Sequence, residues 1–119
     1  MANSVGFHEA EDTLSAATLE RHRATVSLQE ELEAIDWYDQ RIDATRDAEL
    51  RAILIHNRDE EKEHAAMMLE WLRRRDPTFD EKLREQLFTT HPLGQDEEEV
   101  GHGGSDGSLG IGSLRHDHR

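Results

Sequence analysis

Two glutamates and one histidine have the residue types and the spacing needed to bind a metal ion. Glu61 and His64 lie three residues apart in the segment DEEKEHAAMMLEWL, residues 59–72, whose composition favours a helix. Side chains at positions i and i+3 of a helix lie on one face and can reach the same ion. Glu31, in a preceding helical segment, adds another oxygen donor. Oxygen and nitrogen ligands without a thiolate suit iron or manganese, and zinc is an alternative.

These polar residues fall within the apolar faces of two predicted helices. Successive helical residues are offset by about 100°, so each face can be read from the sequence. The face of the second helix comprises Leu50, Ile53, Leu54, Asn57, Glu61, His64, Met68, Trp71 and Leu72. The face of the first helix comprises Leu28, Glu31, Leu32, Ile35, Tyr38, Asp39 and Ile42. Since an unpartnered buried carboxylate is very costly, these glutamates need an explanation.

Three explanations compete for the inward carboxylates. They could pair with arginine or lysine, but Arg41, Arg58 and Lys62 are predicted to project elsewhere. The faces could be incompletely buried, or a metal could neutralise the cluster. The sequence favours the metal explanation, because an E-x-x-H motif and an inward glutamate on a neighbouring helix are half of the ligand set of a di-iron carboxylate bundle.

The ligand count predicts that two copies of the chain complete this site. The bundle needs four helices, two single glutamates and two E-x-x-H motifs, whereas this chain supplies two long helices, one inward glutamate and one motif. A two-fold symmetric dimer would contribute Glu31, Glu61 and His64 twice. Its four carboxylates would balance the charge of two Fe²⁺ ions, and paired metals usually lie about 3.5–4 Å apart.

Composition narrows the remaining function classes. The chain has 119 residues, no cysteine and a formal net charge of −13. This length supports one domain. The absence of cysteine excludes disulfides and zinc-thiolate sites, and the negative charge disfavours nucleic-acid binding. We expect neither a signal peptide nor a membrane span, because no apolar run of suitable length is present.

The predicted architecture is all-α, with no strand-like alternation. Helices are expected at about 11–42, 47–75 and 77–89, with Asp47 and Asp76 as caps. The short connection DATR predicts that the first two helices form a ferritin-like antiparallel hairpin, and dimerisation would complete a four-helix bundle. The expected domains are a flexible N-terminus (1–10), a helical domain (11–90) and a flexible tail (91–119).

One apolar island interrupts the polar tail. Leu109, Ile111 and Leu114 lie within SLGIGSLR, where glycine and serine otherwise dominate. Such a spaced trio is typical of a short docking peptide. The alternative is a chance occurrence in a disordered segment.

The segments EELEAIDWYDQR (30–41) and HNRDEEKEHAAMMLEWLRR (56–74) resemble the encapsulated ferritins, which are cargo proteins of encapsulin nanocompartments. The resemblance covers residues 18–90. In the tail, residues 107–115 are similar to an encapsulin-targeting peptide, although HDHR follows them.

The resemblance implies a ferroxidase that oxidises Fe(II) and supplies iron for mineral storage inside the encapsulin shell, in a bacterial or archaeal cytoplasm. It implies a di-iron centre of Glu31, Glu61 and His64 from two subunits, with Tyr38 close by and Mn, Zn or Ca as substitutes for Fe. It also implies a ring of five homodimers and a second metal-uptake site. That second site would involve Glu30, Glu33 and Trp37.

Two alternative functions stay open at the level of sequence. One is a non-enzymatic helical adaptor, a cargo protein whose metal only stabilises the dimer. The other is a peroxide-reducing di-iron or di-manganese enzyme on the same scaffold. Both would place the same residues at the same positions, so only the reaction separates them from a ferroxidase.

Overall fold

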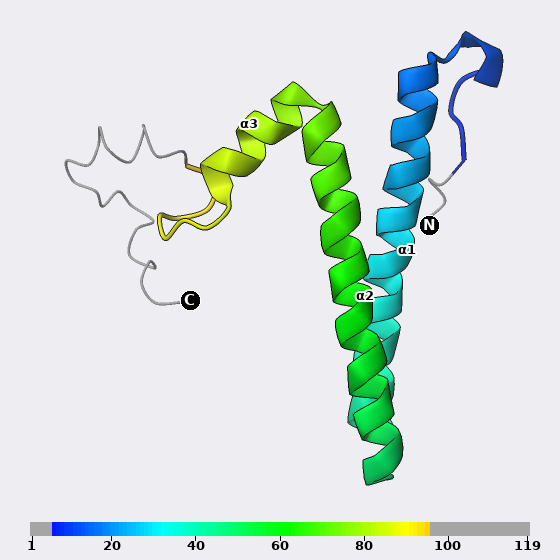
Figure 1. Cartoon of the computed structure of the whole chain (residues 1–119), viewed down its shortest axis with the longest axis vertical. Helices are drawn as coiled ribbons and strands as arrows, with labels where there is room; N and C mark the ends of the chain where they lie inside the picture. The colour runs from blue at the N-terminus through cyan, green and yellow to red at the C-terminus, as the bar shows by residue number, and fades with distance from the viewer. Residues whose placement is uncertain (1–5, 96–119) are drawn as a thin grey trace. The chain divides into compact units, whose positions relative to one another are not determined.

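The described part of the chain, residues 6–95 of a computed structural model, is helical and contains no strand. It comprises a 3₁₀ helix, η2 (Glu11–Thr13), and three α-helices, α1 (Ala16–Ala44), α2 (Ala48–Arg75) and α3 (Pro77–Gln86). Helices α1 and α2 run antiparallel and pack side by side along much of their length (Figure 1). The all-α prediction and the antiparallel hairpin are confirmed. The chain divides into two units between Arg75 and Asp76, and each is described by itself.

Short polar side chains fix where the helices begin. The hydroxyl of Ser15 accepts a hydrogen bond from the backbone N–H of Thr18 at 3.0 Å, which places the start of α1 at Ala16. The prediction of a helix from residue 11 was therefore wrong, because residues 11–13 form a separate 3₁₀ turn. Asp47 and Asp76 cap α2 and α3 as predicted, accepting from the N–H groups of Leu50 and Phe79.

The turn between α1 and α2 is held by an arginine from the second helix. The Arg51 guanidinium donates from Nε to the carbonyl oxygen of Ile42 at 3.2 Å, and from Nη2 to the carbonyl oxygen of Thr45. The last carbonyl groups of a helix have no partner within it, so these bonds satisfy groups that would otherwise depend on water. These bonds also fix the register of α2 against α1.

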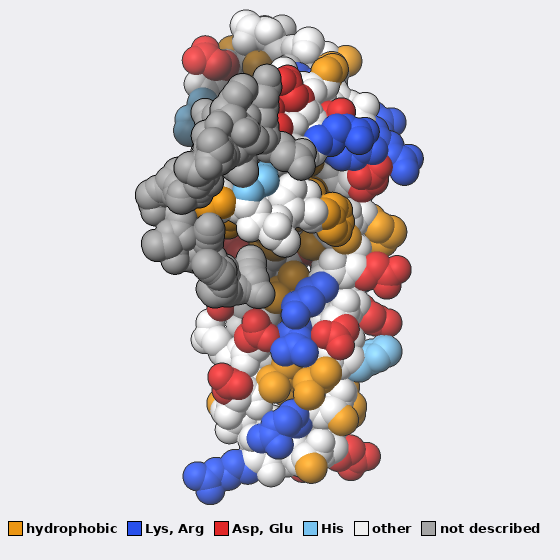
Figure 2. All heavy atoms as spheres, turned by 90° about the vertical axis from the view of Figure 1, so that its left-hand side faces the viewer, with side chains coloured by type: hydrophobic (Ala, Val, Ile, Leu, Met, Phe, Trp, Pro, Cys, Tyr) orange, Lys and Arg blue, Asp and Glu red, His pale blue; other side chains and the backbone are white. Residues whose placement is uncertain are grey.

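The hairpin has a small core. Among the described residues only Ala24, Ile42, Ala65 and Leu72 are buried, and none of the large side chains is fully enclosed. Large hydrophobic side chains stay exposed on the two long helices, namely Leu32, Trp37, Leu50, Ile53 and Met67. Figure 2 shows hydrophobic side chains at the surface between acidic and basic ones. None of the described helices combines the length and apolarity needed to cross a bilayer.

The second unit contains α3 and the segment that follows it. Helix α3 ends at Gln86, before the predicted residue 89, because Leu87 is extended and Phe88 adopts a left-handed backbone with φ of 58°. The chain then folds back on the helix end, where the His91 Nε2 atom lies 2.9 Å from the carbonyl oxygen of Glu85. The predicted docking peptide at 107–115 lies outside the described residues.

Candidate metal centre

Glu31, Glu61 and His64 come together at the middle of the helical hairpin. The His64 Nδ1 atom lies 3.5 Å from a carboxylate oxygen of Glu31 and 3.6 Å from one of Glu61. One potential ligand atom from each residue lies within 4.8 Å of the other two. Within residues 6–95, this is the only cluster of three or more acidic, histidine or cysteine side chains with such geometry. The structure thus brings together the three residues that the sequence singled out.

The antiparallel packing explains why residues 30 positions apart in the sequence meet. Glu31 lies in the middle of α1, and Glu61 and His64 lie one turn apart in α2. Other contacts between the helices follow the same register, since Asp39 contacts Arg58 and Ile42 contacts Arg51. As these contacts advance along α1 they retreat along α2, which places Glu31 opposite the E-x-x-H motif.

The cluster carries an excess of negative charge. The pKa of Glu31 is raised above its ordinary value of 4.5, chiefly by its hydrogen bond with Glu61, and further by burial and by repulsion from the Glu61 carboxylate. The neighbouring His64 acts in the opposite direction but does not outweigh these effects. Two neighbouring carboxylates disfavour each other's ionised form, and a cation placed between them would offset this repulsion.

The donor set and its spacing fit a transition metal ion. Bonds from oxygen and imidazole nitrogen to such metals are about 2.1 Å long, so two ligand atoms on one ion lie at most about 4.2 Å apart. The two distances measured from His64 fall inside this limit. Two carboxylates and one imidazole suit iron, manganese or zinc. The residues present therefore fit the metal that the sequence predicted.

The cluster is open on one side. The side chains of Glu31 and Glu61 are each 25% exposed, and that of His64 is 46% exposed. By helical spacing, the half-exposed Leu50 and Ile53 lie on the same face of α2 as His64. A single chain therefore presents three ligands within a partly apolar surface and leaves further coordination positions open.

One basic residue lies closer to the predicted faces than expected. Arg58 was expected to project elsewhere, but its Nη1 atom donates to the Asp39 carboxylate of α1 at 3.0 Å. The arginine side chain, only 24% exposed, also contacts Asp59 at 3.3 Å. Arg58 therefore does not pair with the inward glutamates, as expected, but its contact with Asp39 was not foreseen. A helical projection of one helix does not show how far a long arginine side chain reaches across the hairpin. Opposite charges at 39 and 58 were the only signal available in the sequence.

The other predicted site residues lie outside the cluster. Tyr38 follows Glu31 by two turns of α1, and its ring lies 5.4 Å from the guanidinium carbon of Arg41. Glu30, Glu33 and Trp37 are exposed on α1. Glu33 lines a shallow groove along this helix, together with Thr25, Leu28, Gln29, Leu32 and Asp36.

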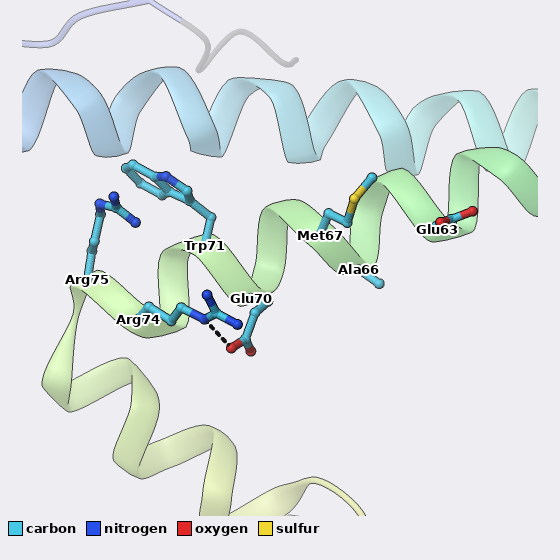
Figure 3. A pocket seen from close by; sticks show the side chains of 7 residues that line it. All are labelled: Glu63, Ala66, Met67, Glu70, Trp71, Arg74 and Arg75. Atoms are coloured by element: carbon cyan, nitrogen blue, oxygen red, sulfur yellow. Dashed lines mark hydrogen bonds and ion pairs between the residues drawn. The ribbon is translucent and has the colours of Figure 1, made fainter.

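A second polar group, near the end of α2, has a different character. Glu70 receives hydrogen bonds from Arg73 and Arg74, and Figure 3 shows the one from Arg74. The Arg75 guanidinium carbon lies 4.0 Å from the centre of the Trp71 ring. The two bonded arginines, Arg73 first, lower the pKa of Glu70 to about 2. This carboxylate is fully partnered by protein cations and has no need of a metal.

Several known proteins are similar to this chain in sequence. The EncFtn-like family matches residues 6–90. The chain is 56% identical over 126 residues to an encapsulated ferritin-like protein from Rhodospirillum rubrum, covering 95% of this chain and 90% of that protein. It is 51% identical to a ferritin-like protein from Thermotoga maritima, covering 91% of this chain and 96% of the relative.

Two further comparisons add a partial relative and a solved structure. The chain is 46% identical over 52 residues to the encapsulin nanocompartment cargo protein EncC from Myxococcus xanthus. This match covers 44% of this chain and 40% of that protein. A crystal structure of a protein from Nitrosomonas europaea is 58% identical and has a TM-score of 0.72, covering 76% of this chain and 99% of that one.

Proposed function

The chain belongs to the EncFtn-like family of encapsulated ferritin-like proteins, and from this premise we propose that it is a ferroxidase acting on Fe(II). The observation that carries the proposal is the convergence of Glu31, Glu61 and His64, with ligand atoms close enough to share one ion. The raised pKa of Glu31 adds an electrostatic reason for a cation to bind there. Fe(II) is the substrate of this reaction, and Mn, Zn or Ca would compete for the same ligands.

The reaction balances with dioxygen or peroxide as the electron acceptor. Two Fe²⁺ ions each lose one electron to hydrogen peroxide, which takes up two protons and gives two water molecules, or four Fe²⁺ ions reduce one dioxygen. The protein contributes binding and proximity, because the carboxylates and imidazole hold the ions in position for oxidation. Tyr38 would lie beside this centre, and exposed Glu30, Glu33 and Trp37 would form a site through which Fe²⁺ enters.

A second copy of the chain would complete the centre. One hairpin supplies three ligands and leaves the face around His64 partly exposed, with Leu50 and Ile53 nearby. A partner hairpin packed on this face would bury the apolar side chains and supply a second set of ligands, giving the four-helix arrangement of di-iron carboxylate proteins. The small core of the single hairpin supports this assembly, since so few buried residues rarely sustain a fold alone. A ring of five such dimers would extend it.

We propose further that the protein delivers its product inside an encapsulin shell. The printed names of two relatives, an encapsulated ferritin-like protein and an encapsulin nanocompartment cargo protein, support this role. The tail segment at 107–115 would dock on the shell, in the cytoplasm of a bacterium or archaeon. Fe(III) formed by the hairpin domain would then be stored as mineral in the compartment.

The ferroxidase proposal is tested by iron oxidation at about one Fe²⁺ per chain. Glu61→Ala should abolish the fast phase of oxidation and retain the helical circular dichroism. Glu60→Ala is the matched control, because Glu60 is the preceding carboxylate of the same helix and pairs with His56 at 3.1 Å. Equal rates in the two variants would contradict the assignment.

Product analysis separates the alternatives. Fe(III) mineral with consumption of dioxygen or peroxide supports the ferroxidase. Soluble iron with catalytic loss of peroxide identifies a peroxide-reducing enzyme, and metal binding without any oxidation identifies a structural adaptor.

The docking role is tested by removing residues 107–119. The truncated protein should keep its iron oxidation rate but fail to load into a co-expressed encapsulin shell. Equal loading of the full and truncated proteins would rule out the docking role of the tail.

A further inference from the structure

Arg58 is a cation placed one helical turn before a residue of the candidate metal centre. Arg58 and Glu61 are three positions apart in α2, a spacing at which oppositely charged side chains can pair. Such pairs form elsewhere in this protein in the same order, since Lys82 lies 3.7 Å from Glu85 in α3. An Arg58–Glu61 pair would occupy a carboxylate that the metal needs.

The structure directs Arg58 elsewhere. Its Nη1 atom donates to the Asp39 carboxylate at 3.0 Å and its Nε atom to the Asp59 carboxylate at 3.3 Å. Asp39 belongs to α1, so the guanidinium reaches across the hairpin, and its partner within α2 is Asp59 and not Glu61. The Arg58 side chain is about three-quarters buried, with 24% exposed, which limits its alternatives. Glu61 meanwhile contacts His64 and interacts with Glu31.

We propose that Asp39 is a positioning residue for the metal centre, because it holds the Arg58 guanidinium and keeps this cation from pairing with Glu61. The inference rests on the proposed function, since it assigns Asp39 a role toward the same carboxylate. Without Asp39, Arg58 keeps only the exposed Asp59 as a partner, and Glu61 becomes the competing acceptor one turn away. An arginine bound to Glu61 would have to be displaced before metal binds, and affinity would fall.

The test measures Mn²⁺ binding to the full-length protein, with free Mn²⁺ followed by electron paramagnetic resonance. Asp39→Ala should weaken binding by about tenfold, the size expected when a hydrogen-bonded charge pair must be broken. Arg58→Met should bind Mn²⁺ at least as tightly as the unmodified protein. The double variant Asp39→Ala/Arg58→Met should recover normal affinity, because the competing cation is absent.

The recovery distinguishes this role from a purely structural one. If Asp39 and Arg58 only hold the helices together, each single change should weaken binding and the double variant should not recover. That pattern, or unchanged affinity in Asp39→Ala, would overturn the inference. If Asp39→Ala fails to fold, Asp39→Asn provides the same comparison, since it keeps the shape of the side chain and removes its charge.

A reference variant separates failure of the inference from failure of the proposed function. Glu61→Ala should lose Mn²⁺ binding if the metal centre is assigned correctly. Loss in Glu61→Ala with normal binding in Asp39→Ala would overturn only the role of Asp39. Normal binding in Glu61→Ala would overturn the metal centre itself, and with it the role of Asp39.

Discussion

Glu61 and Glu70 lie on the same helix, each three residues before a nitrogen-bearing side chain, yet their surroundings are opposite. Glu70 is bonded by Arg73 at 2.7 Å and by Arg74 at 2.6 Å, and its pKa is lowered to about 2. Glu61 instead contacts His64 and a second carboxylate, whose pKa is raised. Within residues 6–95, neither Glu31 nor Glu61 pairs with arginine or lysine.

The difference shows that two glutamates of one helix can be balanced in different ways. At the end of α2 the cations are supplied by the protein, so Glu70 is neutralised without help. In the middle of the hairpin Arg58, three residues before Glu61, contacts Asp39 and Asp59, so it does not pair with the two carboxylates of the cluster. We propose that a metal ion from solution balances this charge, because uncompensated titratable groups that gather in one place are typical of functional sites.

The largest effect is expected when the surroundings of Glu61 are made like those of Glu70. His64→Arg would place a guanidinium three residues after Glu61, as Arg73 lies three residues after Glu70. Fast iron oxidation should fall by at least about a hundredfold, since loss of an outer-shell partner alone typically costs 10–100-fold. The metal-free protein should become more stable to heat, because the arginine would offset the charge of both carboxylates. Both effects can be measured by oxidation kinetics and thermal unfolding.

Two control variants isolate the position and the charge. His56→Arg changes an exposed histidine of the same helix and should leave oxidation unchanged. His64→Gln removes the ligand without adding charge, so it should lose activity without the gain in stability. Retained oxidation in His64→Arg would mean that the two regions do not differ in the way described.

An intermediate effect is expected from pH, with opposite signs in the two regions. Because the pKa of Glu31 is raised when folded, the folded chain binds a proton more tightly than the unfolded chain. Its stabilising effect is therefore present at low pH and is lost as pH rises above the ordinary value of 4.5. Glu70 behaves oppositely, since its contribution is present above 4.5 and is lost as pH falls toward about 2.

Thermal unfolding of the metal-free protein checks the sign at Glu31. Glu31→Gln should be more stable than the unmodified protein at neutral pH, and the difference should shrink as pH falls toward 4.5. A difference that is constant across this range, or that grows on acidification, would contradict the raised pKa.

The smallest effect is expected from the reverse change, in which the surroundings of Glu70 are made like those of Glu61. Arg73→His would create a second E-x-x-H motif at positions 70 and 73, but it adds no inward glutamate from α1. We expect no second phase of iron oxidation. The pKa of Glu70 should rise but stay below its ordinary value, because Arg74 still donates to it. Carboxyl titration by NMR measures this shift, and a new iron-dependent activity would show that the motif alone suffices.

The parts of the fold that depend on local sequence were predictable. Asp47 and Asp76 cap their helices because a short acceptor side chain can bond only to nearby backbone N–H groups. Glu31, Glu61 and His64 were predictable because helical periodicity places polar residues on an apolar face regardless of detailed packing. The predicted start of the first helix was wrong because Ser15 caps α1 and residues 11–13 form a separate 3₁₀ helix.

The parts that depend on the relation between the helices were not predictable. The Arg58–Asp39 contact requires the register and rotation of α2 against α1, together with the reach of a long side chain. The exposure of Leu50 and Ile53 on a single hairpin was implied only by the predicted dimer, since periodicity identifies a shared face but not what covers it. Both features follow from the packing of the two helices, and both enter the proposals on how the centre is positioned and completed.

The central claim is that two copies of the hairpin hold a pair of metal ions between them. A crystal structure of the full-length protein grown with Fe²⁺, with anomalous scattering recorded at the iron edge, tests it most directly. We predict two iron peaks about 3.5–4 Å apart on a two-fold axis, with Glu31, Glu61 and His64 of both chains as ligands. A single iron peak bound by Glu31, Glu61 and His64 of one chain only would contradict the account. Iron bound elsewhere, with these residues free of iron, would contradict it as well.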